Sequence, residues 1–213
     1  PAFHYEILKF SQGNKKITIV PLKVGEYFIR ETTLTENAQH DMIVATTYSK
    51  NPKGNSVDGV YLATVNQAGK LVQFKNGYYE FPIEELKKYE TAKMKRKMDR
   101  KDDYEATNIK VRDVAVEPDG GIFLTMEEYL VVQHTRTNSQ GMISGFYYTW
   151  HYNDMFGAKI NADGKFEWLR KIPKKQMGSS GTGTMGFKFV NDASGYYFLY
   201  LDNLKNLHLP EDE

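Results

Sequence analysis

The chain has 213 residues, with 28 basic and 27 acidic side chains, 14% aromatic residues and no cysteine. The near-neutral charge excludes a whole-molecule field that would attract nucleic acid or an anionic membrane. The lack of cysteine excludes disulfides, thiolate metal sites and cysteine nucleophiles. No apolar stretch approaches the ~18–20 residues that span a bilayer. The length suffices for a sizeable core, and we expect one domain over residues 1–213.

The first expected element is a β-hairpin. Residues 5–10 alternate between apolar and polar side chains, as a half-buried strand does, and residues 16–20 resume this β character. Between them, residues 11–14 (Ser-Gln-Gly-Asn) have the composition of a turn. The pattern therefore predicts two antiparallel strands joined by a loop of about four residues.

The same kind of hairpin recurs twice along the chain. One copy joins residues 61–65 to 70–74 through Asn66-Gln67-Ala68-Gly69. The other joins residues 155–160 to 165–169 through Asn161-Ala162-Asp163-Gly164. Each loop ends in or near a glycine, which adopts a positive φ at little cost because it has no Cβ. We interpret the three hairpins as equivalent parts of a repeat.

A second kind of strand pair alternates with these hairpins. It precedes the second and third hairpin and follows the last. The three pairs are 27–34 with 42–48, 110–116 with 122–127, and 187–190 with 196–201. If this pair is called AB and the hairpin CD, the chain reads CD, ABCD, ABCD, AB.

This order predicts an all-β fold of repeated four-stranded antiparallel units, which is typical of a β-propeller. The half-units at the two ends are complementary, and pairing them would remove two exposed sheet edges. The pieces sum to about three units, whereas propellers typically have four to eight. Because the chain begins at Pro1, we expect it to be a segment with further units outside it. Unrecognised weak copies or another layered β structure are the alternatives.

Two insertions interrupt the repeat. Residues 82–106 are predicted to form a charged helix, since Pro82 suits a first turn and Glu84 and Glu85 favour its positive end. Its basic run is flanked by acidic residues, which favours a solvated surface over a nucleic-acid site. In a further interpretation, this helix docks the chain into a larger assembly. The second insertion, residues 135–145, is polar and is predicted to be a loop.

The stretch 156–168 resembles a repeat of secreted and cell-envelope β-propeller proteins of the Bacteroidota type. In that repeat an apolar strand ends in Asx-x-Asx-Gly and the next strand carries a tryptophan, matched here by Asn161, Asp163, Gly164 and Trp168. The resemblance implies a propeller fold and a periplasmic, outer-membrane-associated or extracellular location. It transfers no catalytic residue, because such repeats carry none in fixed positions.

The densest cluster of functional side chains is Trp150, His151, Tyr152, Asn153 and Asp154. One interpretation is a ligand-binding surface, with the aromatic rings stacking on a flat ligand such as a sugar and His151 with Asp154 providing hydrogen bonds or proton transfer. The other, which we favour on the residues alone, is packing between units with the polar groups bonded to local backbone.

Catalytic chemistry has little support in the sequence. A carbohydrate-active hydrolase would need two carboxylates around a sugar, drawn here from Asp113, Glu127 and Asp154, with Trp150 for stacking. Glu127 and Glu128 are neighbours on a strand and would face opposite sides, so they cannot act as one pair. The five histidines follow no metal-binding pattern, and we expect neither a metal nor another cofactor.

The sequence therefore favours a non-catalytic binding or scaffolding module of a bacterial envelope or secreted protein. We expect a protein or glycan ligand and no nucleic acid. The loops on one face of the units, including 150–154 and 135–145, are the expected binding surface. The alternatives are a carbohydrate-active hydrolase and a structural subunit of a large envelope assembly.

Overall fold

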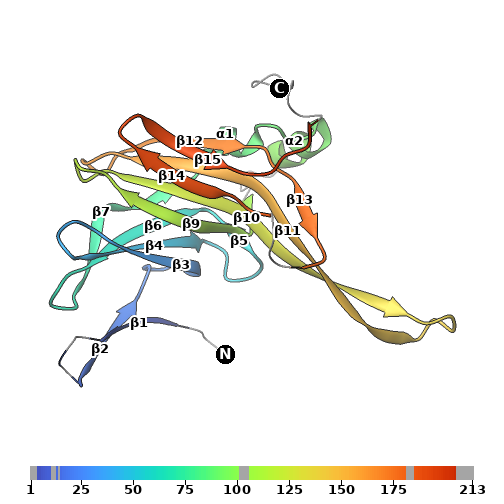
Figure 1. The fold of residues 1–213 in the computed structure, drawn as a ribbon, viewed down its shortest axis with the longest axis horizontal. Coiled ribbons are helices and arrows are strands. Elements are labelled where there is room, and N and C mark those ends of the chain that lie inside the picture. The colour runs from blue at the N-terminus through green and yellow to red at the C-terminus, as the bar shows by residue number, and fades with distance from the viewer. Residues whose placement is uncertain (1–3, 11–12, 14, 101–105, 181–184, 205–213) are drawn as a thin grey trace.

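The computed structural model describes residues 4–10, 13, 15–100, 106–180 and 185–204. It shows an all-β protein in which a four-stranded and a five-stranded antiparallel sheet lie between two hairpins (Figure 1). Ser11, Gln12 and Asn14 of the first predicted turn, and residues 101–105 of the predicted helix, lie outside the described residues.

In each of the two sheets four strands form a meander, as the repeat predicts. Sheet 1 has the order β3-β4-β6-β7, and sheet 2 has the order β9-β10-β11-β12, with β13 pairing β11 beyond β12. The strands of sheet 1 are β3 (Phe28–Glu36), β4 (Met42–Ser49), β6 (Gly59–Val65) and β7 (Leu71–Glu80). Those of sheet 2 are β9 (Ile109–Val116), β10 (Ile122–Thr137), β11 (Ile143–Ile160), β12 (Phe166–Ile172) and β13 (Gln176–Gly178).

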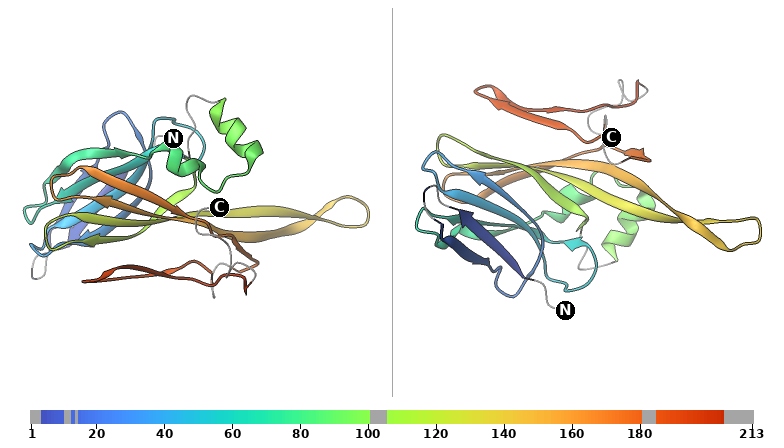
Figure 2. Two further views of the ribbon diagram at one scale, coloured as in Figure 1. Left: turned by 90° about the horizontal axis from the view of Figure 1, so that it is seen from above. Right: turned by 60° about the horizontal axis from the view of Figure 1, so that its bottom comes forward.

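The chain ends form the two outer layers, seen on opposite sides of the sheets in Figures 1 and 2. The N-terminal hairpin comprises β1 (Tyr5–Phe10) and β2 (Ile17–Leu22). The C-terminal hairpin comprises β14 (Lys188–Asp192) and β15 (Gly195–Leu199). A short antiparallel pair, β5 (Ser56–Val57) with β8 (Ala106–Thr107), links the segment between β4 and β6 to the segment that precedes β9. The predicted succession CD, ABCD, ABCD, AB is therefore present.

Strand alternation places the core between the sheets. Along β4, Ile43 and Ala45 face sheet 2, where they share a buried cluster with Ile122 and Leu124 of β10. The intervening Val44 faces the other way, into a second cluster with Val20 of the N-terminal hairpin. The two central strands of sheet 1, β4 and β6, are thus buried on both faces, and nearly every residue along them is buried.

Phe123 anchors the C-terminal hairpin on the outer face of sheet 2. Its ring stacks on Tyr196 with centroids 3.7 Å apart, and on Phe189 at 5.4 Å. Lys159 adds a hydrogen bond of 2.9 Å to the Tyr196 hydroxyl. The first strands of the two sheets are joined by Thr33 Oγ1, which donates to the Val111 carbonyl at 3.1 Å. No described sheet closes into a ring, and a propeller is not shown.

The single helix predicted over 82–106 is wrong. Two short helices are present, α1 (Ile83–Lys87) and α2 (Ala92–Asp99). Tyr89 lies between them with a φ of 61°, a left-handed conformation that a continuous helix cannot contain. Thr91 then caps α2 by accepting a hydrogen bond from the Met94 amide. Neither helix has the length and apolar character needed to cross a membrane, nor does any other described segment form such a helix.

The loop predicted over 135–145 is also wrong. Strand β10 continues to Thr137 and strand β11 begins at Ile143, so only residues 138–142 form the turn. Asn138 Oδ1 accepts hydrogen bonds from the Gln140 and Met142 amides, and Gly141 has a φ of 76°. The result is a long two-stranded extension, here called the arm (residues 129–152), which projects from the body in Figure 1.

Candidate functional site

A pocket of about 450 Å³ opens between sheet 2 and the helices. Its polar wall includes Glu128 of β10, Asp154 of β11, Lys171 of β12 and Glu90 from the segment between α1 and α2. Apolar side chains complete the lining, namely Leu86, Met94, Ala106, Ile109 and Phe156. A concave space with apolar walls and a few converging polar groups is the usual form of a small-ligand site.

Glu128 is the most perturbed acid of this pocket. Burial raises the pKa of its carboxyl group to about 7, and the negative charge of Asp154 adds to the effect. The side-chain oxygen Oδ1 of the neighbouring Asn153 is buried and has no hydrogen-bond partner among the described residues. Glu128 is therefore partly protonated near neutral pH and can donate as well as accept a proton.

Three other charged side chains of the pocket, Lys171, Glu90 and Asp154, are paired with one another. Lys171 Nζ lies 2.7 Å from Glu90 Oε1 and 3.0 Å from Asp154 Oδ2. It also donates to the Leu86 carbonyl at 3.2 Å. Burial opposes the charge of Lys171, but the hydrogen bond that it donates to Glu90 and the charge of Asp154 outweigh this effect, so the pKa of Lys171 is raised. Lys171 is thus a fixed cation that joins Glu90 and Asp154 at the wall of the pocket.

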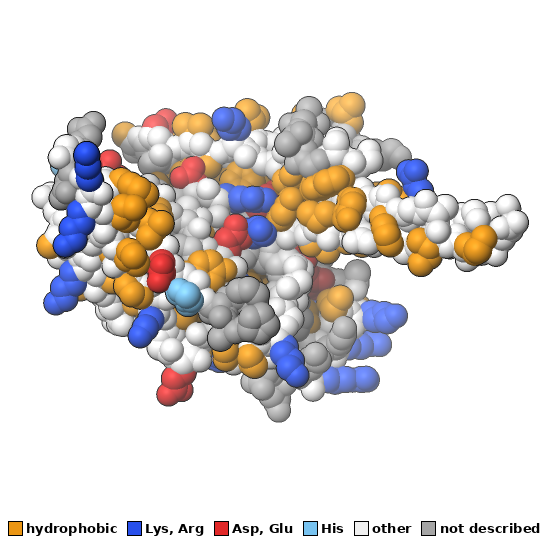
Figure 3. All heavy atoms as spheres, turned by 90° about the horizontal axis from the view of Figure 1, so that it is seen from below, with side chains coloured by type: hydrophobic (Ala, Val, Ile, Leu, Met, Phe, Trp, Pro, Cys, Tyr) orange, Lys and Arg blue, Asp and Glu red, His pale blue; other side chains and the backbone are white. Residues whose placement is uncertain are grey.

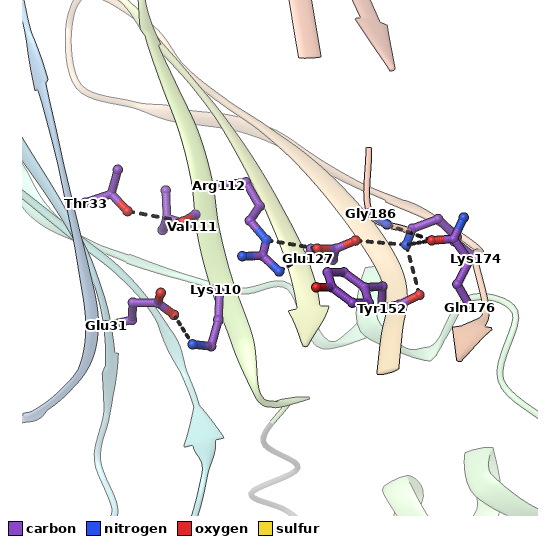
Figure 4. A network of polar contacts seen from close by, with 10 residues as sticks. All are labelled: Glu31, Thr33, Lys110, Val111, Arg112, Glu127, Tyr152, Lys174, Gln176 and Gly186. Atoms are coloured by element: carbon purple, nitrogen blue, oxygen red, sulfur yellow. Dashed lines mark hydrogen bonds and ion pairs between the residues drawn. The ribbon is translucent and has the colours of Figure 1, made fainter. Parts of the chain in front are cut away.

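A second polar cluster surrounds Glu127 of β10 (Figure 4), and its Lys174 also contributes to the lining of the pocket. Glu127 is almost fully buried and its carboxylate is bound from two sides. Arg112 approaches Oε2 at 2.7 Å and Lys174 approaches Oε1 at 2.8 Å. Lys174 also donates to the Tyr152 carbonyl at 2.9 Å and to Gln176 Oε1 at 3.1 Å. Glu127 and Glu128 face opposite sides, as strand alternation requires.

The three acids proposed for hydrolysis are not brought together as a set. Asp154 lines the pocket, whereas Glu127 is held by its two cations on the other face. Asp113 is exposed and accepts a hydrogen bond from the Val114 amide. The acid that does share the pocket with Asp154 is Glu128. Sequence reasoning placed Glu128 on the opposite face from Glu127 but had no signal for its burial.

The cluster 150–154 is divided along β11 rather than gathered in a loop. Trp150 lies opposite Val131 and near Tyr148, with ring centroids 6.2 Å apart. His151 shares a hydrogen bond of 3.1 Å with Thr149 Oγ1. Tyr152 packs edge-on against Tyr129 beside Arg112. Only Asn153 and Asp154 reach the pocket, so the five residues do not form one binding surface.

Lys171 and Lys174 were missed, because lysines in a Lys- and Pro-rich stretch read as solvated surface. No histidine of the described residues lines the pocket. Within the described ranges, no group of three or more His, Asp or Glu side chains is arranged to hold a metal ion.

The Glu128→Gln variant is expected to be more heat-stable than the wild type at pH 8, with a much smaller gain at pH 5. The folded-state pKa of Glu128, about 7, lies above the ordinary glutamate value of 4.5, so the wild type loses stability as pH rises from 4.5 to 7. Glutamine cannot ionise, so the variant does not lose this stability as pH rises. Thermal melts at both pH values test this, with Glu167→Gln, an exposed acid on β12, as the control. An equal gain at pH 5 would contradict the assigned cause.

Comparison with known proteins gives no match to a family model, to a curated protein or to a solved structure. The functional assignment therefore rests on the geometry of the chain itself.

Proposed function

We propose that this chain is a non-catalytic binding and scaffolding module of a bacterial envelope or secreted protein, built on a propeller-like stack of units. The observation that carries the proposal is the arm. Between Tyr129 and Tyr152 the sequence holds a single Lys, Arg, Asp or Glu residue, Arg136. Such a two-stranded ribbon is marginally stable in water without a covering surface.

The arm presents apolar and aromatic side chains to solvent, seen along the projection in Figure 3. Phe146 is 55% exposed and Ile143 is 66% exposed. Strand β9 pairs with β10 only as far as Glu128, so the outer edge of β10 is unpaired from Leu130 onwards within the described chain. The exposed members are Val131, Met142, Ile143, Phe146, Tyr147 and Tyr148. An apolar ribbon with a free edge fits a protein partner that offers an apolar surface or a strand.

A photo-crosslinking amino acid at position 146 tests this proposal. In an envelope extract of a Bacteroidota bacterium, we expect one discrete crosslinked partner that unlabelled wild-type protein displaces. The double variant Ile143→Ser, Phe146→Ser should fail to displace it, because it lacks the apolar contacts. The same crosslinker at Val72, an exposed apolar position of β7, is the control. Identical bands from both positions, or none from position 146, would remove the arm as a docking element.

A second candidate is a carbohydrate-active hydrolase, favoured by the pocket with Glu128 and Asp154. A carboxyl group with a pKa near 7 is suited to act as general acid, and Asp154, which pairs with Lys171, would be the second carboxylate. If the chain is a hydrolase, the wild-type protein should hydrolyse at least one of a panel of chromogenic glycosides. The Glu128→Gln variant should lose this activity and the Glu167→Gln variant should keep it. Our leading proposal expects no turnover from the wild type.

The third interpretation, a subunit that docks through residues 82–106, also remains a proposal. Parts of this segment are engaged in the body: Met98 is fully buried, and Glu85 pairs with Arg170 at 3.1 Å. The exposed face of α2 includes Lys93, Lys95 and Arg96. Charge reversal on that face would leave the fold intact. It is therefore a better test of docking through this segment than deletion of residues 82–106.

A further inference from the structure

We infer that the pocket between sheet 2 and the helices binds a small organic amine, whose ammonium group pairs with Glu128 while its apolar part lies against the hydrophobic wall. That wall is formed by Leu86, Met94, Ala106, Ile109 and Phe156. The pocket is separate from the arm, so this site does not rest on the leading functional proposal. It differs from the hydrolase candidate in that Glu128 binds a cation and does not protonate a glycoside.

Glu128 faces the pocket because of its place on β10. Strand alternation turns it to the inner face of sheet 2, on which Met126 of the same strand belongs to the core. The helices lie on this side of sheet 2, and the C-terminal hairpin lies on the other side (Figure 2). The pocket volume of about 450 Å³ is in the range of small-ligand sites. Apolar walls beside one polar group select a ligand with an apolar body and a polar head.

The two buried lysines of the pocket have no N–H group left for a ligand. An ammonium group carries three donors. Lys171 Nζ donates to the Leu86 carbonyl at 3.2 Å and to Glu90 Oε1 at 2.7 Å, and it lies 3.0 Å from Asp154 Oδ2. Lys174 Nζ likewise donates to three acceptors, at 2.8, 2.9 and 3.1 Å. A ligand that binds beside these lysines must therefore bring donors of its own.

Glu128 is the carboxyl group of the pocket that lacks a counter-ion. Lys171 joins Glu90 to Asp154, and no cation of the described residues forms an ion pair with Glu128. Burial disfavours the charge of Glu128, and the negative charges of Asp154 and Glu90 add to this effect. The charge of Lys171 and a hydrogen bond from Asn153 oppose it without cancelling it. A ligand ammonium group would supply the missing positive charge and a charge-assisted hydrogen bond.

The same groups disfavour the two other kinds of polar head. A carboxylate would meet the like charges of Glu90 and Asp154 and would find no free donor on the buried lysines. Lys175, a further cation of the lining, is exposed, so its long side chain can keep its charge in water. An alcohol can donate a hydrogen bond to Glu128, but it does not neutralise the charge of the carboxylate.

Calorimetric titration with three probes that share one apolar body tests this preference. At pH 8 we expect 2-phenylethylamine to bind at least about tenfold more tightly than 2-phenylethanol, because charge-assisted hydrogen bonds are roughly twice as strong as neutral ones. The third probe, 3-phenylpropionate, should not bind measurably. Tightest binding by 3-phenylpropionate, or no binding of the amine at millimolar concentration, would overturn the inference.

The role of Glu128 is tested by pH and by replacement. The amine binds the carboxylate form, so a pKa of about 7 makes the affinity of the wild type roughly tenfold weaker at pH 6 than at pH 8. The Glu128→Gln variant should lose this pH dependence and the preference for the amine over the alcohol. Glu167→Gln, which removes an exposed acid of β12, should keep both. An affinity for the amine that Glu128→Gln leaves unchanged would refute the assigned contact, as would equal wild-type affinities at the two pH values.

Bulk added to the apolar wall tests whether the amine lies in this pocket. Met94 of α2 lines the pocket and is 37% exposed, so a tryptophan at this position narrows the space without entering the core. We expect Met94→Trp to weaken the binding of 2-phenylethylamine. Lys93→Trp, at a neighbouring position of α2 that is not among the described lining residues, should leave it unchanged. Thermal melts establish that both variants are folded. Equal affinities in the two variants would place the amine elsewhere on the chain and contradict the proposed site.

Discussion

Replacement of Glu127 by alanine is expected to lower the free energy of unfolding by about 3–5 kcal/mol. Glu127 is the only carboxylate that forms an ion pair with the Lys174 ammonium group among the described residues, and both side chains are 1% exposed. Its removal leaves Lys174 as a buried ammonium group beside Arg112. A buried charge that has lost its partner costs far more than an exposed one, because water cannot solvate it.

The pH dependence of the Glu127→Ala variant separates this cause from a packing defect. Burial already lowers the pKa of Lys174, and hydrogen bonding and attraction from Glu127 oppose that shift. Without Glu127 the folded-state pKa falls further, so the variant should regain stability as pH rises above neutrality and Lys174 loses its proton. Chemical denaturation at pH 7 and pH 9.5 measures this. The control is Glu80→Ala, whose exposed pair with Lys50 contributes less than about 1 kcal/mol. A loss that does not change with pH would contradict the buried-charge explanation.

The Gly164→Ala variant is expected to be destabilised by about 3 kcal/mol, the sum of a backbone and a packing effect. Gly164 has a φ of 78°, which costs an alanine roughly 1 kcal/mol. Its added Cβ would also lie 2.1 Å from the Lys75 Cβ of sheet 1. The Gly164 carbonyl accepts a hydrogen bond of 2.9 Å from Asn76, so this turn of sheet 2 is fixed against sheet 1 and cannot move aside.

The repeat provides matched controls for Gly164→Ala. Gly13 occupies the equivalent turn of the N-terminal hairpin with a φ of 77°, and an added Cβ meets no described atom within 4 Å. Gly13→Ala should therefore cost only the backbone part, about 1 kcal/mol. Gly69→Ala should fall between them, since its nearest neighbour is the Thr18 methyl group at 2.8 Å. Equal losses in all three variants, measured by denaturant unfolding, would show that the contact with Lys75 contributes nothing.

The arm shows how a signal in the sequence can be overlooked. Asn138-Ser139-Gln140-Gly141 has the same Asn-x-x-Gly pattern as Asn66–Gly69 and Asn161–Gly164. In all three turns the asparagine side chain accepts a hydrogen bond from the amide four residues later. The Asn-x-x-Gly pattern therefore predicts this turn, but the short polar run around it does not indicate the flanking strands. Their length depends on pairing between β10 and β11, which composition alone does not report.

The sequence by itself determined the all-β class, the strand pairs and the order of units, because each pair is formed by segments that are close in sequence and joined by a specific turn. It did not determine the pocket, where Glu90, Glu128, Asp154 and Lys171 arrive from separate elements. It also gave no sign that Lys174 is buried, since a lysine carries the same local pattern whether it is solvated or paired. Only the tertiary structure decided these features, because burial and pKa depend on what other parts of the chain pack against each group.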